Sequence, residues 1–351
     1  MSLLQTPLTV RGTTFRNRAW VSPMCQYSAR DGLPDDWHLV HLGTRAVGGA
    51  GLVLTEATAV SPEGRISPQD TGIWNDEQAQ AWSRIAAFVR AQGAVAGIQL
   101  AHAGRKASTH RAWDTEHGTV ARAVGGWSTV GPSPVAFGRY AVPAELDLEG
   151  IAKVRADFLA AVARSRHAGF QVVELHAAHG YLLHNFLSPL ANERTDSYGG
   201  SFDNRVRLLL EVVEDVRSAW DGPLFVRISA TDWTDGGWTL ADSVRLAPLL
   251  AARGVDLVDV SSGGLHHTQQ VAVEPGYQVP FAAAIRATGI ATGAVGMITE
   301  PKQAEEVLVT GQADAVLLAR ELLRDPYWPL RAATELGDDI AWPPQYDRAR
   351  P

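Results

Sequence analysis

Residues 148–181 decide the fold of this chain and read LEGIAKVRADFLAAVARSRHAGFQVVELHAAHGY. The first part predicts an amphipathic helix over Leu148–Ala168, and Gly169 suits the left-handed residue with which helices commonly end. A short apolar run then predicts a strand over Val172–His176. Helices that alternate with strands in this way imply parallel strand pairing through right-handed crossovers.

The same alternation extends along the 351 residues. The predicted strands are Ala19–Pro23, Leu52–Ala57, Gly97–Ala101, Val172–His176, Leu224–Ser229, Leu257–Ser261, Ile290–Gly296 and Ala315–Ala319. The predicted helices are Trp37–Val47, Asp76–Gln92, Leu148–Ala168, Phe202–Trp220, Leu240–Arg253, Pro280–Thr288 and Pro301–Thr310, with another that begins near Glu321. These repeated units favour an α/β fold, a single-domain (β/α)8 TIM barrel over residues 1–351. An open doubly wound sheet stays as the alternative, because a count of units does not show closure.

Composition and charge exclude several classes of protein. The formal net charge of −7 is spread along the chain, whereas a nucleic-acid-binding protein normally carries a clustered basic face. Cys25 is the one cysteine, which excludes an intramolecular disulfide and a four-cysteine iron–sulfur cluster. The N-terminal residues do not resemble a signal peptide, and no apolar stretch is long enough to span a membrane. We therefore expect a cytoplasmic protein without nucleic-acid or membrane partners.

Two segments interrupt the alternation. Residues 102–147 are rich in Gly, Pro, Ser and Trp, and a loop this long inside a compact domain is usually functional. We predict that it forms a cap over the active site. Residues 338–351 are polar and rich in proline, and on their own they are as consistent with a frayed terminus as with an ordered tail.

The active site of a barrel lies at the carboxyl ends of its strands. The residues at these predicted ends are Ser22, Pro23, Met24, Cys25, Gln26, Tyr27, Glu56, Ala57, Gln99, His102, His176, His179, Arg227, Ser261, Ser262, Gly263, Gly296, Ala319 and Arg320. They supply hydrogen-bond donors, a thiol, arginines and glycines, but no cluster of carboxylates. A hard-metal site or a two-carboxylate glycosidase is therefore poorly supported. Gly296 and Arg320 suit a phosphate, although a glycine after a strand is often only a tight turn.

His176, His179 and Tyr181 emerge together from one strand end. Histidine and tyrosine donate hydrogen bonds, and Tyr181 can also deliver a proton, which suits an electron-poor substrate. Metal ligation together with His184 and a purely structural role are the alternatives. Lys106 is either a Schiff-base lysine or, more simply, a solvated loop charge. Cys25 on its own resembles an inert buried thiol, and an inward Arg227 requires an anionic or carbonyl partner.

The run from His176 to Arg205 closely resembles the Old Yellow Enzyme family of FMN-dependent ene-reductases. The resemblance extends from Thr6 to Arg348, and its motifs are similar to the thermophilic-like subgroup. These motifs are Ser22-Pro-Met-Cys25-Gln-Tyr27, Gln99-Leu-Ala-His-Ala-Gly-Arg-Lys106, His176-Ala-Ala-His179-Gly-Tyr181, Ala291-Thr-Gly-Ala-Val-Gly296-Met and Arg320-Glu-Leu-Leu-Arg-Asp-Pro326. The family usually has Gly where Ala319 stands, and other members have Thr in place of Cys25.

The resemblance implies a role for each matching residue. FMN would be held by Ser22, Pro23, Met24, Cys25, Ala57, Gln99, Arg227, Gly296, Ala319 and Arg320. Arg227 would face the N1/O2 edge of the flavin, and Cys25 would tune its redox potential. His176 and His179 would bind the activating oxygen of the substrate in a pocket that Tyr27 lines, and Tyr181 would donate the proton. The resemblance also implies a homodimer or homotetramer, with residues 338–351 at an interface and Arg348 in the neighbouring subunit's site.

The activity implied is that of an NAD(P)H-dependent flavin oxidoreductase of the NADPH dehydrogenase or enoate reductase type. NADPH or NADH would give hydride to FMN, which would pass it to Cβ of an α,β-unsaturated carbonyl compound, imide or nitroalkene while Cα is protonated. No metal ion is expected. The alternatives are a metal- or lysine-dependent lyase on the same fold, which would use His176, His179 and Lys106, and a non-enzymatic flavin binder.

Overall fold

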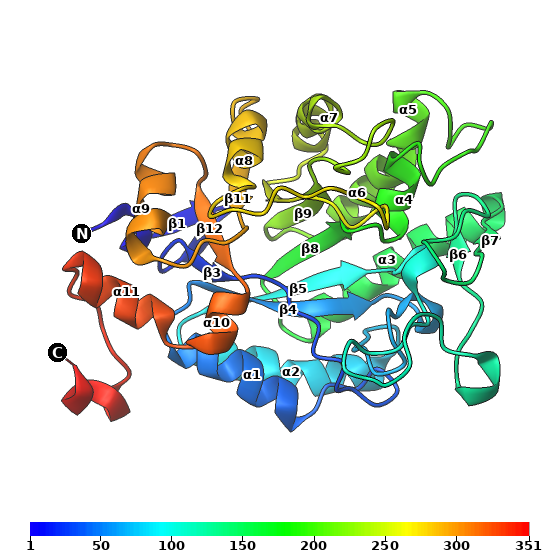
Figure 1. Ribbon diagram of the computed structural model, residues 1–351. Helices are drawn as coiled ribbons and strands as arrows, with labels where there is room; N and C mark the ends of the chain where they lie inside the picture. Colours follow the sequence, from blue (N-terminus) through cyan, green and yellow to red (C-terminus); the bar gives the residue numbers. More distant parts are fainter. Residues whose placement is uncertain (351) are drawn as a thin grey trace.

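A closed barrel of parallel strands forms the centre of the computed structural model, which describes residues 1–350 (Figure 1). The strands follow one another around the barrel in the order β10-β11-β12-β3-β4-β5-β8-β9. Their bounds are β3 (Ala19–Val21), β4 (Leu52–Ala59), β5 (Val95–Ala101), β8 (Val172–Ala177), β9 (Leu224–Ser229), β10 (Leu257–Ser261), β11 (Ala291–Ala294) and β12 (Ala315–Leu318). All the predicted strands are present. The predicted (β/α)8 TIM barrel is confirmed, and closure excludes the open sheet.

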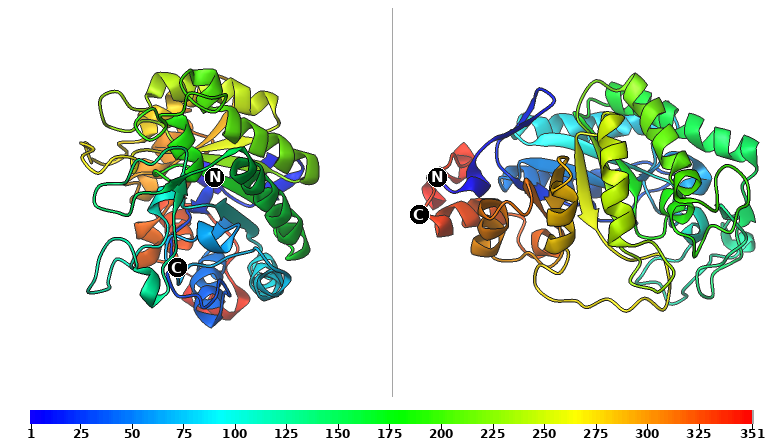
Figure 2. Two further views of the ribbon diagram at one scale, coloured as in Figure 1. Left: turned by 90° about the vertical axis from the view of Figure 1, so that its right-hand side faces the viewer. Right: turned by 90° about the horizontal axis from the view of Figure 1, so that it is seen from above.

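Helices surround the barrel and return the chain between strands (Figures 1 and 2). They are α1 (Asp36–Val47), α2 (Asp76–Ala91), α3 (Leu148–His167), α4 (Leu182–Leu187), α5 (Phe202–Arg205), α6 (Arg207–Ala219), α7 (Leu240–Ala252), α8 (Val279–Arg286), α9 (Pro301–Val309), α10 (Arg320–Arg324) and α11 (Trp328–Leu336). The helix α3 ends as predicted, because Gly169 has φ +83°. The continuous helix predicted over Phe202–Trp220 is wrong, since Val206 separates α5 from α6. Val206 keeps near-helical angles of φ −80° and ψ −12°, so one buried apolar face still runs across both helices.

An N-terminal hairpin that the sequence did not predict closes one end of the barrel. It consists of β1 (Leu8–Val10) and β2 (Thr13–Phe15). The Phe15 ring lies 4.7 Å from the Trp20 ring and 6.3 Å from the Phe225 ring, measured between centroids. All three side chains are fully buried. Because aromatic packing seals this end, a ligand can enter only at the opposite end, where the strands have their carboxyl termini.

The long loop and the C-terminal tail lie at opposite ends of the barrel (Figure 1). Residues 102–147 contain the 3-10 turns η3 (Gly104–Lys106) and η4 (Arg122–Val124) and the short paired strands β6 (Val130–Gly131) and β7 (Ala144–Glu145). The tail contains the 3-10 turn η5 (Pro344–Ala349) and lies beside the N-terminus. Among residues 1–350, no helix is long and apolar enough to cross a membrane.

Candidate active site

A polar layer lies inside the barrel, directly above its apolar floor. Along β8, β9 and β10, alternate residues point inward, and each strand changes from apolar to polar side chains toward its carboxyl end. Gln99 donates a hydrogen bond from Nε2 to Oε1 of Glu174 at 2.8 Å. The Nε atom of Arg227 lies 3.2 Å from Oδ2 of Asp259, and both side chains are buried. The sequence predicted an anionic or carbonyl partner for Arg227, and the structure shows that an anionic one, Asp259, lies beside it.

The charges of this layer nearly cancel. Burial, together with the neighbouring carboxylate of Asp259, raises the pKa of Glu174, and burial also raises the pKa of Asp259. In a buried site, ionisation of both carboxyl groups beside a single guanidinium group is energetically unfavourable. The raised pKa values favour the neutral form of each carboxyl group and so limit the negative charge opposite Arg227. The charge of the guanidinium group is balanced by Asp259, which is the register partner of Arg227 on β10.

His176 and His179 bring two ring nitrogens together above this layer. Nε2 of His176 and Nδ1 of His179 are 3.4 Å apart. Nδ1 of His176 accepts from the backbone N–H of Ala178 at 3.2 Å, so its proton is on Nε2. Nε2 of His179 lies 2.7 Å from the Ser261 hydroxyl, whose other contact, to Gln278 Oε1, is longer at 3.4 Å. Ser261 is the donor in its contact with Gln278; if it donates to His179 instead, over the shorter distance, His179 carries its proton on Nδ1, and both imidazoles present an N–H at the same place.

Both imidazoles are neutral at physiological pH. Burial lowers the pKa of His176 and of His179 well below the ordinary value, and the positive charge of Arg227 lowers both further. In that tautomer neither N–H has an acceptor, because the 3.4 Å contact between the rings is a hydrogen bond only when Nδ1 of His179 accepts. An oxygen atom beside the two nitrogens and within reach of both would accept both hydrogen bonds, and the pair is thus suited to an oxygen that gains negative charge during a reaction.

Tyr181 lies beside His176 and packs with two residues of the segment that follows β3. The Tyr181 ring is perpendicular to the His176 ring, with 4.9 Å between centroids. Burial raises the pKa of Tyr181, so its hydroxyl keeps the proton that a donor needs. Cys25 and Tyr27 pack with Tyr181 against a small apolar cluster that includes Ala57. Burial, followed by the charges of nearby carboxylates, raises the pKa of Cys25, and its thiol is therefore not a reactive thiolate.

Buried contacts fix the segment that carries Ser22 to Tyr27. Ser22 donates from its backbone N–H to the Leu318 carbonyl oxygen at 3.0 Å, which joins the first strand to the last. Gln26 donates its backbone N–H to Oε2 of Glu56 at 2.8 Å. The other carboxylate oxygen of Glu56 lies 3.2 Å from Nε2 of His38. A register irregularity in β4 between Leu54 and Ala57 turns this carboxylate toward the segment.

Lys106 is not the solvated loop charge that the sequence suggested. Its Nζ atom donates to the carbonyl oxygens of His179 at 2.8 Å and of Gly264 at 2.9 Å. It also lies 4.5 Å from the centre of the Phe137 ring and 5.2 Å from that of Tyr181. Burial lowers its pKa to about 8, and the adjacent Arg105 contributes. The sequence could not show this, because the carbonyl groups come from two other strand-end loops.

The loops after β11 and β12 border a cavity of about 260 Å³ that suits a phosphate group. Gly296, Ala319 and Arg320 line it. Within residues 1–350, the backbone N–H groups of Gly296 and Met297 donate no hydrogen bond, and Arg320 forms no ion pair. Gly296 has φ +119°, and a Cβ there would lie 2.6 Å from Nε2 of Gln278. Free N–H groups beside an unpaired guanidinium group match the chemistry of a phosphate ester.

Two predicted features lie away from this pocket. Arg348 is exposed in η5, at the sealed end of the barrel, so it does not reach the mouth of its own chain. His184 does not join His176 and His179 around a metal ion, because its Nδ1 accepts a hydrogen bond from the Gly180 backbone N–H at 2.9 Å. No group of three or more potential ligand side chains is present among residues 1–350. The residues of the proposed lyase site therefore form no metal centre, and Lys106 is held by two carbonyl groups.

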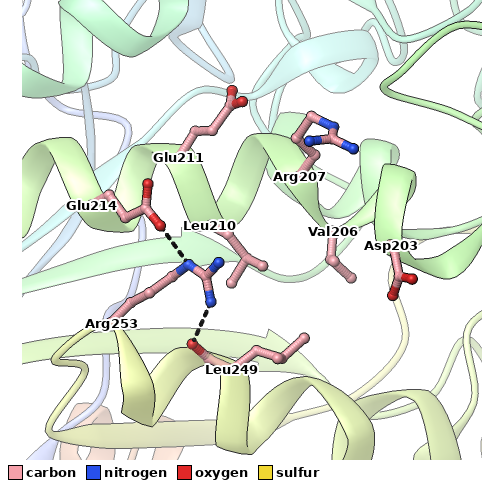
Figure 3. A pocket seen from close by; sticks show the side chains of 8 residues that line it. All are labelled: Asp203, Val206, Arg207, Leu210, Glu211, Glu214, Leu249 and Arg253. Carbon is pink, nitrogen blue, oxygen red and sulfur yellow. Dashed lines mark hydrogen bonds and ion pairs between the residues drawn. The ribbon is translucent and has the colours of Figure 1, made fainter.

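A larger hollow of about 360 Å³ lies on the outer surface between α6 and α7 (Figure 3). Its lining residues are Asp203, Val206, Arg207, Leu210, Glu211, Glu214, Leu249 and Arg253. The Arg253 guanidinium group donates to Oε1 of Glu214 at 2.7 Å and to the Leu249 carbonyl oxygen at 3.2 Å. This hollow is a surface groove with paired charges, far from the strand ends. The residues that are suited to catalysis therefore lie at the open end of the barrel, not in this groove.

Comparison with known proteins agrees with this geometry. Residues 3–339 match the model of the NADH:flavin oxidoreductase / NADH oxidase family. The chain belongs to this family. It is 47% identical over 349 residues to an NADPH dehydrogenase of Bacillus subtilis (strain 168), covering 98% of each chain. It is 48% identical to an NADPH dehydrogenase of Geobacillus sp. (strain WCH70), covering 99% of this chain and 98% of the relative.

A solved structure supports the same assignment. The fold is similar to that of morphinone reductase in complex with tetrahydroNAD, with a TM-score of 0.79 and 26% identity over 97% of this chain and 93% of the other. The protein is thus an NAD(P)H-dependent flavin oxidoreductase with FMN as its cofactor. The phosphate-sized cavity and the Arg227 layer fit such a cofactor, since FMN carries one phosphate and a ring system whose reduced form is anionic.

Sequence reasoning placed Glu56 and Ser261 at strand ends without giving them a role, and it missed three further residues that complete this site. The three are Asp259, His38, which contacts Glu56, and Asp232, which contacts His184. A signal for Asp259 was present in the alternation of strand residues. Asp259 and Ser261 occupy the same inward phase of β10 as Leu257, just as Glu174 and His176 follow Val172. For the others no local pattern exists, because their partners are distant in the sequence.

Proposed function

We propose that this protein reduces the activated C=C bond of α,β-unsaturated carbonyl compounds, imides or nitroalkenes. The observation that carries the proposal is the pair of neutral imidazoles of His176 and His179, whose ring nitrogens lie 3.4 Å apart beside the Tyr181 ring. A carbonyl or nitro oxygen that accepts from both rings would be polarised, and the adjacent alkene would become electron-poor. One such contact typically lowers a barrier by about 3–4 kcal/mol.

The residues that would hold FMN are those gathered at the strand ends. Gly296, Ala319 and Arg320 would bind its phosphate, while Gln99 and Arg227 would lie under the ring together with the Ser22–Cys25 segment and Ala57. When bound, FMN supplies the redox chemistry, since it accepts hydride from NAD(P)H and passes hydride to Cβ of the alkene. The thiol of Cys25, kept neutral by burial, would contact the ring without acting as a nucleophile.

Tyr181 would complete the reaction by protonating Cα. Its raised pKa keeps the hydroxyl protonated at neutral pH, and the buried Lys106 cation, 5.2 Å from its ring, would stabilise the phenolate that remains. A general acid typically contributes about 10²- to 10⁴-fold to a rate. Tyr27, packed in the same apolar cluster, would line the pocket.

Anaerobic stopped-flow kinetics test the proposal by separating the two half-reactions. Tyr181→Phe should slow alkene reduction by about 100-fold or more and leave flavin reduction by NADPH unchanged. Tyr198→Phe is a matched control, because the Tyr198 hydroxyl bonds Glu211 away from the strand ends. Equal loss of both half-reactions in Tyr181→Phe would contradict the assigned role. If NADPH reduces the flavin of the wild-type protein but no enone reoxidises it, the proposed function is wrong.

We also propose that Arg348 acts in the site of a neighbouring subunit of a homodimer or homotetramer. The support is its exposed position at the sealed end of the barrel, which leaves it accessible to another copy of the chain. Light scattering after size exclusion would give the oligomeric state. Arg348→Ala should raise the KM for the alkene, and an unchanged KM or a monomeric protein would refute this assignment.

A further inference from the structure

The turn that joins His179 to Tyr181 has a strained backbone. His179 has φ +58° and Gly180 has φ +74°, so two successive residues are left-handed. A non-glycine residue in this region costs about 1–3 kcal/mol and persists only when its surroundings hold it there. A Cβ on Gly180 would lie 2.3 Å from the Gly264 carbonyl oxygen. The direction in which the chain presents Tyr181 therefore depends on what holds this turn.

Side chains hold all four backbone polar groups of the turn. The N–H of His179 donates to the Ser229 hydroxyl at 2.9 Å, and its carbonyl oxygen accepts from Lys106 at 2.8 Å. The N–H of Gly180 donates to Nδ1 of His184 at 2.9 Å, and its carbonyl oxygen accepts from Nδ2 of Asn185 at 2.8 Å. His184 supports the peptide group that joins His179 to Gly180, and Asn185 supports the next one, which joins Gly180 to Tyr181.

The state of the His184 ring follows from these contacts. Since Nδ1 accepts a hydrogen bond, the proton of the neutral ring is on Nε2. Nε2 lies 2.9 Å from Oδ1 of Asp232, and within residues 1–350 neither atom has a hydrogen bond to another group. The contact is angled rather than linear, but both side chains are fully buried, so no water competes for either atom.

Asp232 is itself fixed as a carboxylate. Its Oδ2 atom accepts from the Ser188 hydroxyl at 2.6 Å and from the Trp238 backbone N–H at 2.7 Å. Burial acts to raise the pKa of Asp232, but His184 and these two donors more than offset it, so the pKa is below its usual value. A carboxylate beside Nε2 favours the tautomer with the proton on Nε2, and this leaves Nδ1 free to accept from Gly180.

We propose that His184, held in one tautomer by Asp232, is a positioning residue that sets where Tyr181 delivers its proton. The inference rests on the proposed role of Tyr181 in alkene reduction. His184 is fully buried and acts through the peptide group that joins His179 to Gly180. Loss of the acceptor at Nδ1 would leave the Gly180 N–H buried without a partner and would release the strained turn.

Three variants separate this role from general destabilisation. His184→Leu removes the acceptor, whereas His184→Gln keeps an amide oxygen that can accept from Gly180. Asp232→Asn places an amide N–H₂ or oxygen beside Nε2 and removes the preference for one tautomer. His167→Leu is the matched control, because His167 is an exposed histidine at the end of α3.

The assay uses the FMN-loaded protein and 2-methylcyclohex-2-enone, whose Cα becomes a stereocentre when it is protonated. In His184→Leu and Asp232→Asn we expect about 100-fold slower alkene reduction, the loss that a misplacement of about 1 Å commonly causes. The enantiomeric excess of 2-methylcyclohexanone should fall, because solvent protonates from either face. Flavin reduction by NADPH and the Kd of 4-nitrophenolate should stay within about threefold of the wild type, and His184→Gln should recover most of the rate and the enantiomeric excess.

Two outcomes would overturn the inference. One is wild-type rate and enantiomeric excess in both His184→Leu and Asp232→Asn. The other is a parallel loss of NADPH reduction and phenolate binding, which would show only a general structural role. If His184→Leu does not fold, Asp232→Asn and His184→Gln carry the test. If the wild-type protein reduces no alkene, the proposed function is wrong. If instead Tyr181→Phe reduces alkenes slowly while the His184 variants behave like the wild type, only the role of His184 is wrong.

Discussion

The paired N–H donors of His176 and His179 make ligand binding the sharpest test of the site. His179→Ala removes one donor and leaves the other. A hydrogen bond to a charged acceptor contributes about 1.5–3 kcal/mol, and about 1.4 kcal/mol corresponds to a factor of ten. The Kd of an anionic phenolate should therefore rise about 10- to 150-fold in His179→Ala and, by the same reasoning, in His176→Ala.

The geometry also predicts how these losses combine. The two nitrogens are 3.4 Å apart and would share one oxygen, so the two donors form one interaction unit. The double variant should lose less binding free energy than the sum of the single losses. Ser261→Ala removes the hydroxyl that fixes the His179 tautomer, and a neutral hydrogen bond of about 0.5–1.5 kcal/mol predicts a Kd increase of about 2- to 13-fold.

Spectrophotometric titration of the FMN-loaded variants with 4-nitrophenolate measures these values. Each variant is first checked for full FMN content, because Ser261 also lines the phosphate-sized cavity. His167→Ala, at an exposed position, should bind like the wild type. Binding within twofold of the wild type in both His176→Ala and His179→Ala would refute the donor-pair reasoning and place the ligand elsewhere.

Three further predictions concern stability and cofactor binding. Lys106→Met leaves the buried carbonyl oxygens of His179 and Gly264 without a donor, so urea unfolding should show a free energy of unfolding lower by about 2–4 kcal/mol. Lys302→Met, at an exposed position, should leave the free energy of unfolding unchanged. Equal stabilities of the two variants would contradict the Lys106 contacts. Because burial holds the pKa of His176 below its ordinary value of about 6.5, the unfolded state binds more protons below that pH, and stability should fall as the pH decreases from there. His176→Asn should reduce the slope of unfolding free energy against pH between pH 6 and 5 by about 1.4 kcal/mol per pH unit, and an unchanged slope would count against the neutral imidazole. Arg320→Gln should weaken FMN binding to the apoprotein about 10- to 150-fold in a fluorescence titration. The control is Arg324→Gln, which should bind FMN within about threefold of the wild type, because the Arg324 side chain is paired with Glu321. Similar losses in both variants would show that Arg320 does not bind the phosphate.

The sequence predicted the strand set because each strand is a short apolar run bounded by local signals. Leu224–Ser229 and Leu257–Ser261 were predicted with their observed bounds. It also placed His176, His179, Arg227 and the phosphate residues at one end of the barrel, since parallel strands bring their carboxyl ends together. The break at Val206 and the short helix Leu182–Leu187 were not predicted, because a one-residue interruption and a six-residue helix give almost no periodic signal.

Local chemistry therefore determined the strand and helix pattern, the identity of the donors at the strand ends, and the resemblance on which the FMN assignment first rested. Only the tertiary structure decided the protonation and direction of those donors. The tautomer of His179 depends on Ser261, 82 residues away, and Lys106 finds its carbonyl acceptors 73 and 158 residues away. The physical reason is that a hydrogen bond depends on distance and angle in space, and barrel closure brings together groups that no local pattern relates.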